Sequence, residues 1–223
     1  MNYPDFFTLP QLAVLIKYEK LLAERGKVMN LTAITDHDEV FEKHFIDSVL
    51  PLRFFELSEN AAVVDVGSGA GFPGVPLKIV RPDISLTCFD STLKKIGFLR
   101  ELSSEIGIDF AAENIRAEEA GQSDLYREHF DVAVSRAVAA LPVLLELCLP
   151  LVKVGGVFAA FKGEKENIDE SAKAAEKLGA KIKKSEKYSL PSGDRRQLFV
   201  FEKIKNTPAE FPREYSKIKN KAL

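Results

Sequence analysis

A glycine-rich stretch, VVDVGSGAGFPG at residues 63–74, follows an apolar run that is typical of a buried strand. Gly67, Gly69 and Gly71 would let the backbone pass close to a ligand at the carboxyl end of a sheet. The letters fit G-x-G-x-G, which suggests an S-adenosylmethionine site, and also G-x-G-x-x-G, which suggests a dinucleotide site. A glycine turn without a ligand is the third interpretation.

Three features beside this turn favour S-adenosylmethionine. Asp65 precedes the glycines, where a carboxylate opposes a pyrophosphate but suits the cationic amino acid group, directly or through water. Pro73 and Pro76 each remove a backbone N–H from the start of the next helix, where a dinucleotide site needs phosphate donors. Asp90, 25 residues after Asp65, can accept both ribose hydroxyls, although dehydrogenases share that carboxylate. We therefore predict S-adenosylmethionine as cofactor and S-adenosylhomocysteine as product.

A second segment, NIRAEE at residues 114–119, follows the third expected strand, where an adenine would lie. Ala117 could supply backbone contacts, and Glu118 could accept a hydrogen bond from the adenine amino group. A helix-start carboxylate is an equally good interpretation of Glu118, so both stay open here.

The segment VSRA at residues 134–137, at the end of the fourth expected strand, is where such enzymes place groups that face the methyl acceptor. The segment has no N-P-P-Y or D-P-P-Y pattern for an exocyclic amine. It also has no cysteine for the covalent route to 5-methylcytosine and no nearby histidine for activating a hydroxyl. Guanine N7 needs no general base because its lone pair is free. Catalysis by alignment alone can lower a barrier by about 7–11 kcal/mol.

Two basic residues at expected strand ends, Arg136 and Lys162, are the catalytic candidates. Either could donate to guanine O6 or hold a phosphate while N7 stays free. The alternatives are a salt bridge for Arg136 and a solvated strand end for Lys162.

The elements that must position these residues follow from hydrophobic periodicity. Helical spacing covers residues 9–25, with Gly26 as the stop, and a second helix is expected from the N-cap Asp36 to Phe55, with Pro51 as a kink or break. The remaining pattern is an alternation of strands and helices, which predicts a mostly parallel sheet with right-handed crossovers. The expected strands are 61–66, 84–89, 130–135 and 155–161, the expected helices 75–80, 93–106, 138–152 and 165–178, and an antiparallel hairpin is expected at 181–204.

These elements predict a helical extension at 1–60, a catalytic domain at 61–205 and a tail at 206–223 that is extended or mobile. Residues 1–161 hold 15 basic and 23 acidic side chains, whereas 162–223 hold 16 basic and 10 acidic ones. That asymmetry fits a basic face for phosphates, or simply a solvated lysine-rich region. No apolar run approaches the roughly 20 residues of a membrane span, and no signal peptide is recognisable.

Cys88 and Cys148 are the chain's two cysteines, and both lie in apolar stretches far apart in the sequence. We expect them to be buried and reduced, which predicts a cytoplasmic protein without a structural metal site. Nothing in the sequence indicates a membrane partner, and a monomer is our expectation.

An ordered set of motifs carries a resemblance to a known family. The matching pieces are NLTA at 30–33, His44 with Asp47-Ser48, DVGSGAGFPG with Pro76-Leu77, Asp90-Ser91 with Lys94-Lys95, Ala117-Glu118, SRA at 135–137 and FKG at 161–163. Along nearly its whole length the chain resembles the 16S ribosomal RNA guanine-N7 methyltransferase family RsmG, also called GidB.

The resemblance implies a class I Rossmann-like methyltransferase fold with a seven-stranded sheet and a helical N-terminal addition. It also implies methyl transfer to N7 of the guanosine at position 527, in the 530 loop of 16S rRNA, with the small ribosomal subunit as partner. By position, Gly67, Phe72, Ala117, Glu118 and Arg136 would contact the cofactor, which weakens the assignment of Arg136 to guanine O6.

Other residues carried over from the family lie near the same pocket. His44, Asp47 and Ser48 would border it, although a pairing of His44 with Asp47 at a helix N-terminus is the plainer interpretation. Ser91 and the glycines complete the predicted cofactor site. The residues predicted to contact RNA or substrate are His44, Asp47, Ser48, Arg53, Arg195 and Arg196. The tail after Arg213 lacks the later glycine and prolines of longer family members. A small-molecule methyltransferase and a non-catalytic S-adenosylmethionine-binding module remain the rival hypotheses.

Overall fold

A seven-stranded sheet forms the centre of the protein, with the strand order β3-β2-β1-β4-β5-β7-β6. The structure is a computed structural model that describes residues 3–164, 166 and 168–223. The strands are β1 (Ala62–Val66), β2 (Ser85–Asp90), β3 (Ala111–Asn114), β4 (Phe130–Arg136), β5 (Val152–Gly163), β6 (Ala180–Ser189) and β7 (Arg195–Lys203).

The sheet has the predicted mixture of strand directions. β1 to β5 run parallel to one another, and β7 runs antiparallel to both β5 and β6. The strand order reverses between β1 and β4, and ligands of open α/β sheets bind outside the carboxyl ends at such a point. The predicted Rossmann-like α/β fold and its C-terminal hairpin are therefore confirmed.

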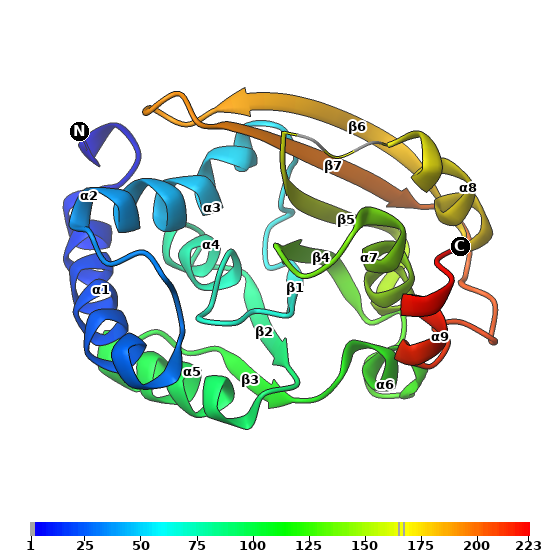
Figure 1. Ribbon diagram of the computed structural model, residues 1–223, viewed down its shortest axis with the longest axis horizontal. Coiled ribbons are helices and arrows are strands. Elements are labelled where there is room, and N and C mark those ends of the chain that lie inside the picture. The colour runs from blue at the N-terminus through cyan, green and yellow to red at the C-terminus, as the bar shows by residue number, and fades with distance from the viewer. Residues whose placement is uncertain (1–2, 165, 167) are drawn as a thin grey trace.

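Helices cover both faces of the sheet, because side chains alternate between the faces along each strand. Val63 of β1 faces one core and Val64 faces the other. The helices α1 (Leu9–Met29), α4 (Gly74–Val80) and α5 (Leu93–Ile106) lie on one side, and α6 (Ala117–Gln122), α7 (Leu141–Cys148), α8 (Asp169–Lys177) and α9 (Tyr215–Asn220) lie on the other (Figure 1).

The first helix is longer than the sequence predicts. Gly26 is inside α1, and the helix ends at Asn30, which has the left-handed φ of 51° and donates its N–H to the Gly26 carbonyl. Asparagine tolerates this conformation at little cost, so the stop at Gly26 was the wrong choice between two residues that can end a helix.

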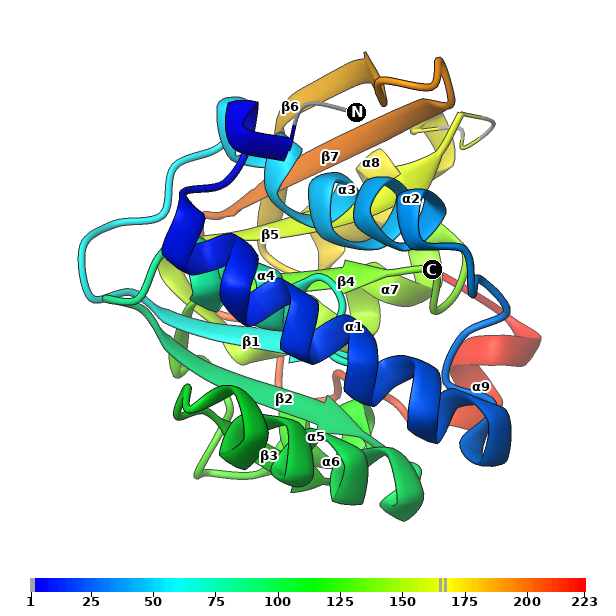
Figure 2. The ribbon, with the colours of Figure 1, turned by 90° about the vertical axis from the view of Figure 1, so that its left-hand side faces the viewer.

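The second prefix segment begins as predicted, since the Asp36 carboxylate accepts the N–H of Glu39 at 3.0 Å. It continues as α2 (His37–Val40), a π-helical turn (Phe41–Ile46), α3 (Asp47–Val49) and a 3₁₀ turn (Leu50–Arg53) that contains Pro51. Figure 2 shows α1 crossing in front of the sheet, with α2 and α3 above it towards β7. The prefix therefore reaches the edge of the sheet where the strands end.

Two helices differ in extent from their predictions, and a third was not predicted. The helix expected at 138–152 is α7 followed by a 3₁₀ turn, Leu149–Leu151. The helix expected at 165–178 is described from Asp169, and residues 165 and 167 lie outside the described residues. The short helix α6 was not predicted, because its six residues are too few for a hydrophobic period.

The C-terminal tail is folded against the domain, so its predicted extended or mobile state is wrong. It forms α9, whose Ile218 is completely buried. Arg127 donates to the carbonyls of Thr207 and Phe211, each at 2.7 Å. Both cysteines are buried and free, as predicted. Among the described residues, we find no helix with the length and apolar character needed to cross a bilayer.

Candidate cofactor and substrate site

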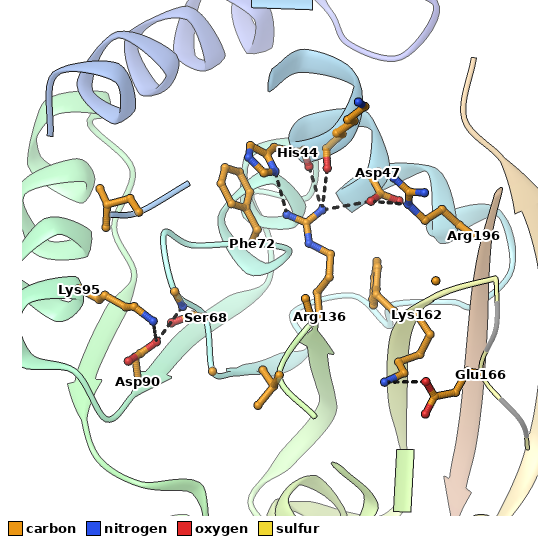
Figure 3. A pocket seen from close by; sticks show the side chains of 18 of the residues that line it. His44, Asp47, Ser68, Phe72, Asp90, Lys95, Arg136, Lys162, Glu166 and Arg196 are labelled. Atoms are coloured by element: carbon orange, nitrogen blue, oxygen red, sulfur yellow. Dashed lines mark hydrogen bonds and ion pairs between the residues drawn. The ribbon is translucent and has the colours of Figure 1, made fainter. Parts of the chain in front are cut away.

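A cavity of about 1090 Å³ opens at the carboxyl ends of the central strands (Figure 3). Its walls come from the β1–β2 side of the sheet, the prefix helices, the ends of β4 and β5, and the β6–β7 hairpin. The predicted site residues that line it are Gly67, Gly69, Phe72, Asp90, Ser91, Arg136, Lys162, His44, Asp47, Arg195 and Arg196.

A second cavity, of about 180 Å³, adjoins the first and is lined by Ala117 and Glu118. The two cavities share Gly67, Asp90, Ser91 and Val138. The remaining predicted residues, Asp65, Gly71, Ser48 and Arg53, line neither.

The glycine turn has the backbone that the sequence predicts. Gly67, Gly69 and Gly71 have φ values of 72°, 59° and 99°, a region that side-chain-bearing residues rarely adopt. The turn is fixed to β2, because the N–H groups of Gly67 and Ser68 both donate to the Phe89 carbonyl, at 2.9 and 3.0 Å.

The Asp90 carboxylate joins this turn to the start of α5. Its Oδ2 accepts the N–H of Gly69 at 3.0 Å, and its Oδ1 accepts the N–H of Thr92 at 2.8 Å. The Lys95 ammonium lies 3.4 Å from Oδ2. A carboxylate oxygen has two lone pairs, so Asp90 keeps acceptor capacity towards both cavities.

Asp65 lies beneath the turn rather than in a cavity. It is fully buried, and its Oδ2 accepts the N–H of Gly74 at 2.8 Å. Its Oδ1 has no hydrogen-bond partner among the described residues. Burial raises the pKa of Asp65 to about 7, although the Gly74 hydrogen bond and Arg136 act against that shift. This geometry favours support of the turn, and contact with a ligand stays a prediction.

Phe72 stands at the centre of an aromatic stack. His44 stacks on it with ring centroids 4.6 Å apart, and Tyr18 of α1 stacks on it at 5.3 Å. The Tyr18 hydroxyl donates to the Ala70 carbonyl in the turn. The prefix therefore holds the cofactor turn through stacked rings and one buried hydrogen bond.

The Arg136 guanidinium points from β4 to the prefix helices (Figure 3). It donates to the carbonyls of Lys43 and His44 at 3.3 and 3.4 Å, and lies 3.5 Å from the Asp47 carboxylate. It also lies over the Phe72 ring, at 5.1 Å from the centroid. Burial lowers the pKa of Arg136, and Asp47 acts against that shift. The ion pair considered for Arg136 is present, and its guanidinium still lines the larger cavity.

Within the described chain we find no bond between His44 and Asp47, although the Arg136 guanidinium lies 3.5 Å from both the His44 ring and the Asp47 carboxylate. The His44 Nε2 lies 2.7 Å from the Thr32 hydroxyl. Burial, and then the positive charge of Arg136, lower the pKa of His44 to about 4, so it is neutral at pH 7. Asp47 accepts from Arg196 Nε at 3.1 Å and from the Tyr188 hydroxyl at 3.2 Å. Asp47 thereby connects the prefix to the hairpin.

Lys162 lies at the end of β5, with its side chain 9% exposed, so it is not a solvated strand end. Its ammonium donates to the Ala139 carbonyl at 2.6 Å and lies 3.1 Å from Glu166 Oε2. Two of its three N–H donors are thus engaged, and the third is available to a ligand in the cavity.

Comparison with known proteins decides the family. Residues 11–199 match the family described as GidB, rRNA small subunit methyltransferase G. The chain belongs to this family. Curated members named Ribosomal RNA small subunit methyltransferase G include one from Alkaliphilus metalliredigens, 47% identical over 92% of this chain and 87% of that protein, and one from Lactobacillus acidophilus, 47% identical over 88% and 85%.

Solved structures of more distant proteins share the fold of this chain. TrmN from Thermus thermophilus has a TM-score of 0.54 at 19% identity, covering 70% of this chain and 48% of that one. TYW2 from M. jannaschii, solved in complex with AdoMet, has a TM-score of 0.50 at 18% identity, covering 66% and 70%. The class I Rossmann-like methyltransferase fold is therefore confirmed.

Several contributors to the candidate site were not identified from the sequence. Tyr18 and Tyr188 were given no role, because only packing brings Tyr18 to Phe72 and Tyr188 to Asp47. Lys95 was noted in a motif but given no role, and here it pairs with Asp90. The further lining residues without a predicted role are Leu31, Lys43, Ser68, Thr92, Ala137, Val138, Phe161, Gly163, Glu164 and Glu166.

The predicted RNA-contact residues fall into two groups. Arg195 and Arg196 begin β7 and line the larger cavity, where Arg195 pairs with Glu164 at 2.6 Å. Arg53 is exposed on the 3₁₀ turn away from the lining, and Ser48 is buried with its hydroxyl on the His44 carbonyl at 2.5 Å. The RNA-contact roles of these four residues, and of His44 and Asp47 in the cavity lining, stay predictions.

Proposed function

We propose that this chain transfers the methyl group of S-adenosylmethionine to N7 of a guanosine in 16S rRNA, at position 527 of the 530 loop. One observation supports the proposal above all: a member of the rRNA small subunit methyltransferase G family has two adjoining cavities that meet at Gly67, Asp90 and Ser91. A ligand that consists of a nucleoside joined to a second group suits such a pair of cavities, because each part can occupy one of them.

The residues present fit S-adenosylmethionine. The smaller cavity has an apolar lining that includes Phe89, Ile115 and Leu147, which suits an adenine ring. Asp90 stands where the cavities meet, so its carboxylate would accept the ribose hydroxyls. At Gly69 a Cβ atom would meet little besides the Gly67 carbonyl oxygen at 3.9 Å, so the turn leaves room for the amino acid part.

The larger cavity suits a guanine whose N7 attacks without a general base. When bound, the cofactor supplies an electrophilic methyl group. His44 has a pKa of about 4, too low for an effective base at neutral pH, and N7 requires none. The free N–H of Lys162 would donate to guanine O6 or to a phosphate, while Arg136 fixes the wall beside Phe72.

Positive charge in the lining of the larger cavity supports an RNA substrate over a small apolar acceptor. Lys43, Lys95, Arg195 and Arg196 all line the cavity, where the small-molecule hypothesis expects a closed apolar pocket. A guanosine in a structured loop would be splayed out of its stack to reach Lys162. The proposal includes a monomeric enzyme. It also places the enzyme in the reducing cytoplasm, which the two buried free thiols support.

The test incubates the protein with methyl-labelled S-adenosylmethionine and either small ribosomal subunits or naked 16S rRNA. Cleavage chemistry specific for N7-methylguanosine, followed by primer extension, then locates the modification. We expect one labelled guanosine at position 527. Label at another atom or nucleotide would contradict the proposed specificity, and binding without transfer would favour the non-catalytic module.

A further inference from the structure

The smaller cavity has one wall that comes from the C-terminal tail. Tyr215, the first residue of α9, lines it together with Leu147 of α7 and with Ala117 and Glu118 of α6. Tyr215 is 37% exposed, which places it on the solvent side, while Leu147 is buried. The tail therefore encloses the cavity to which the proposed function assigns the adenine.

We propose that Tyr215 contacts the nucleobase of the cofactor, and that an ion pair between Arg213 and Glu146 positions it there. This inference rests on the proposed function only in taking S-adenosylmethionine as the ligand. It does not depend on which RNA atom is methylated. The tail then acts in cofactor binding, whereas the sequence suggested at most a role in RNA binding.

The Arg213–Glu146 pair ties the tail to the helix that forms the cavity wall. Arg213 Nε donates to Glu146 Oε1 at 2.7 Å, its second nitrogen donates to Oε2 at 2.6 Å, and its backbone N–H donates to Oε1 at 2.9 Å. Glu146 is completely buried, so these contacts supply its charge compensation. Leu147, the next residue of α7, lines the cavity.

Further contacts fix the tail to α6 and α7 on either side of Tyr215. The Gln122 side chain at the end of α6 donates to the Pro212 carbonyl at 2.9 Å. After Tyr215, Ile218 is buried in the core that includes Leu144 of α7. Figure 1 shows α9 beside α6 and α7. Tyr215 is thus held between fixed points, which suits a contact whose geometry matters.

The chemistry of the cavity suits a planar base. An aromatic ring contacts the π-face of any base, and the ring of Tyr215 would complement the apolar side chains of Phe89 and Ile115. Glu118, in the same lining, offers a carboxylate acceptor for an exocyclic amino group. Because the cavity continues into the one at Asp90, the base that enters it is the one attached to the ribose.

The first experiment measures binding of S-adenosylmethionine and S-adenosylhomocysteine by calorimetry to full-length variants. Tyr215→Ala should weaken both ligands about tenfold, the loss expected for one base–aromatic contact. Tyr215→Phe should bind within about twofold of the unmodified protein, because the ring is retained. Lys219→Ala, an exposed change on the same helix, is the matched control and should have no effect. Unchanged binding by Tyr215→Ala would overturn the inference.

The second experiment tests the positioning role of Arg213. Arg213→Gln should lose affinity to the same degree as Tyr215→Ala, and the double variant should lose no more than either. Arg213→Lys, which keeps a charge opposite Glu146, should restore most of the affinity. Additive losses in the double variant would refute the positioning role. If Arg213→Gln does not fold, the Tyr215 variants and Arg213→Lys still decide.

The outcomes separate this inference from the proposed function. If the unmodified protein binds no S-adenosylmethionine, the proposed cofactor is refuted and the inference with it. If it binds and Tyr215→Ala binds equally well, only the inference falls. If the methyl group is found on another atom, the role of Tyr215 stands.

Discussion

Asp90 is the residue on which the two cavities depend most directly. Its carboxylate receives the N–H groups of Gly69 and Thr92 and faces both cavities. We expect Asp90→Ala to weaken S-adenosylmethionine binding at least about tenfold, because hydrogen bonds to a charged group contribute about 1.5–3 kcal/mol each. Calorimetry measures the loss, and the exposed Asp109→Ala serves as control. Unchanged affinity would refute the ribose role.

The raised pKa of Asp65 predicts how the stability of the protein depends on pH. Its pKa is about 7 in the folded protein and near 3.8 in the unfolded chain, so folding favours the neutral acid. The stability that this preference contributes is complete below about pH 4 and is lost as the pH rises through about 7. Asp65→Asn has no such loss and still offers an oxygen to the Gly74 N–H.

Urea unfolding gives the free energy of unfolding of Asp65→Asn minus that of the unmodified protein. This difference should rise by about 2 kcal/mol between pH 5 and pH 8, since one pKa unit corresponds to about 1.4 kcal/mol. The subtraction removes the opposite contribution of His44, whose lowered pKa costs stability as the pH falls from 6.5 towards 4. A difference that stays constant with pH would contradict a buried neutral Asp65. Retained cofactor affinity in Asp65→Asn would favour support of the turn over direct contact.

Helix α1 acts on the cofactor turn from outside the sheet. The Tyr18 hydroxyl is buried and donates to the Ala70 carbonyl, while its ring stacks on Phe72. Tyr18→Phe keeps the stack and removes the hydrogen bond, leaving a buried carbonyl without that donor. We expect a loss of about 1–2 kcal/mol in the free energy of unfolding. Denaturant unfolding measures the loss, and Tyr126→Phe is the control, because the Tyr126 hydroxyl makes no hydrogen bond with the described residues. Equal stabilities would show that the hydroxyl contributes nothing.

The accuracy of the sequence predictions differs among elements for physical reasons. Strands such as β1 and β5 could be predicted because a buried strand is an apolar run, and the glycine turn because only glycine readily adopts its φ values. The tail could not, since its order comes from Arg213 and Glu146, which are 67 residues apart. Tyr18 and Tyr215 gave no signal, because a tyrosine at a helical position looks the same whether it packs in a core or lines a cavity.

At the scale of the whole molecule, the parts that build the site come from both ends of the chain. The Asp47 carboxylate brings together the prefix, β4 through Arg136, and the hairpin through Arg196 and Tyr188. The basic excess of residues 162–223 pointed to a phosphate-binding face, but the sequence could not say which cations face the site. The structure places Arg195 and Arg196 in the lining and leaves Arg53 outside it.

This arrangement predicts that basic residues at the two ends of the strands differ in their effect on RNA binding. Arg195 lines the larger cavity and has an exposed side chain, whereas Lys153 lies at the opposite end of β5 from Lys162 and pairs with Asp131. If Arg195 contacts a phosphate, Arg195→Ala should weaken rRNA binding and reduce the slope of log affinity against log salt by about one. Lys153→Ala should leave the slope unchanged, and both variants should keep their affinity for S-adenosylmethionine. Filter binding across a salt series measures the slopes, and equal slopes for Arg195→Ala and the unmodified protein would place the RNA on another face of the molecule.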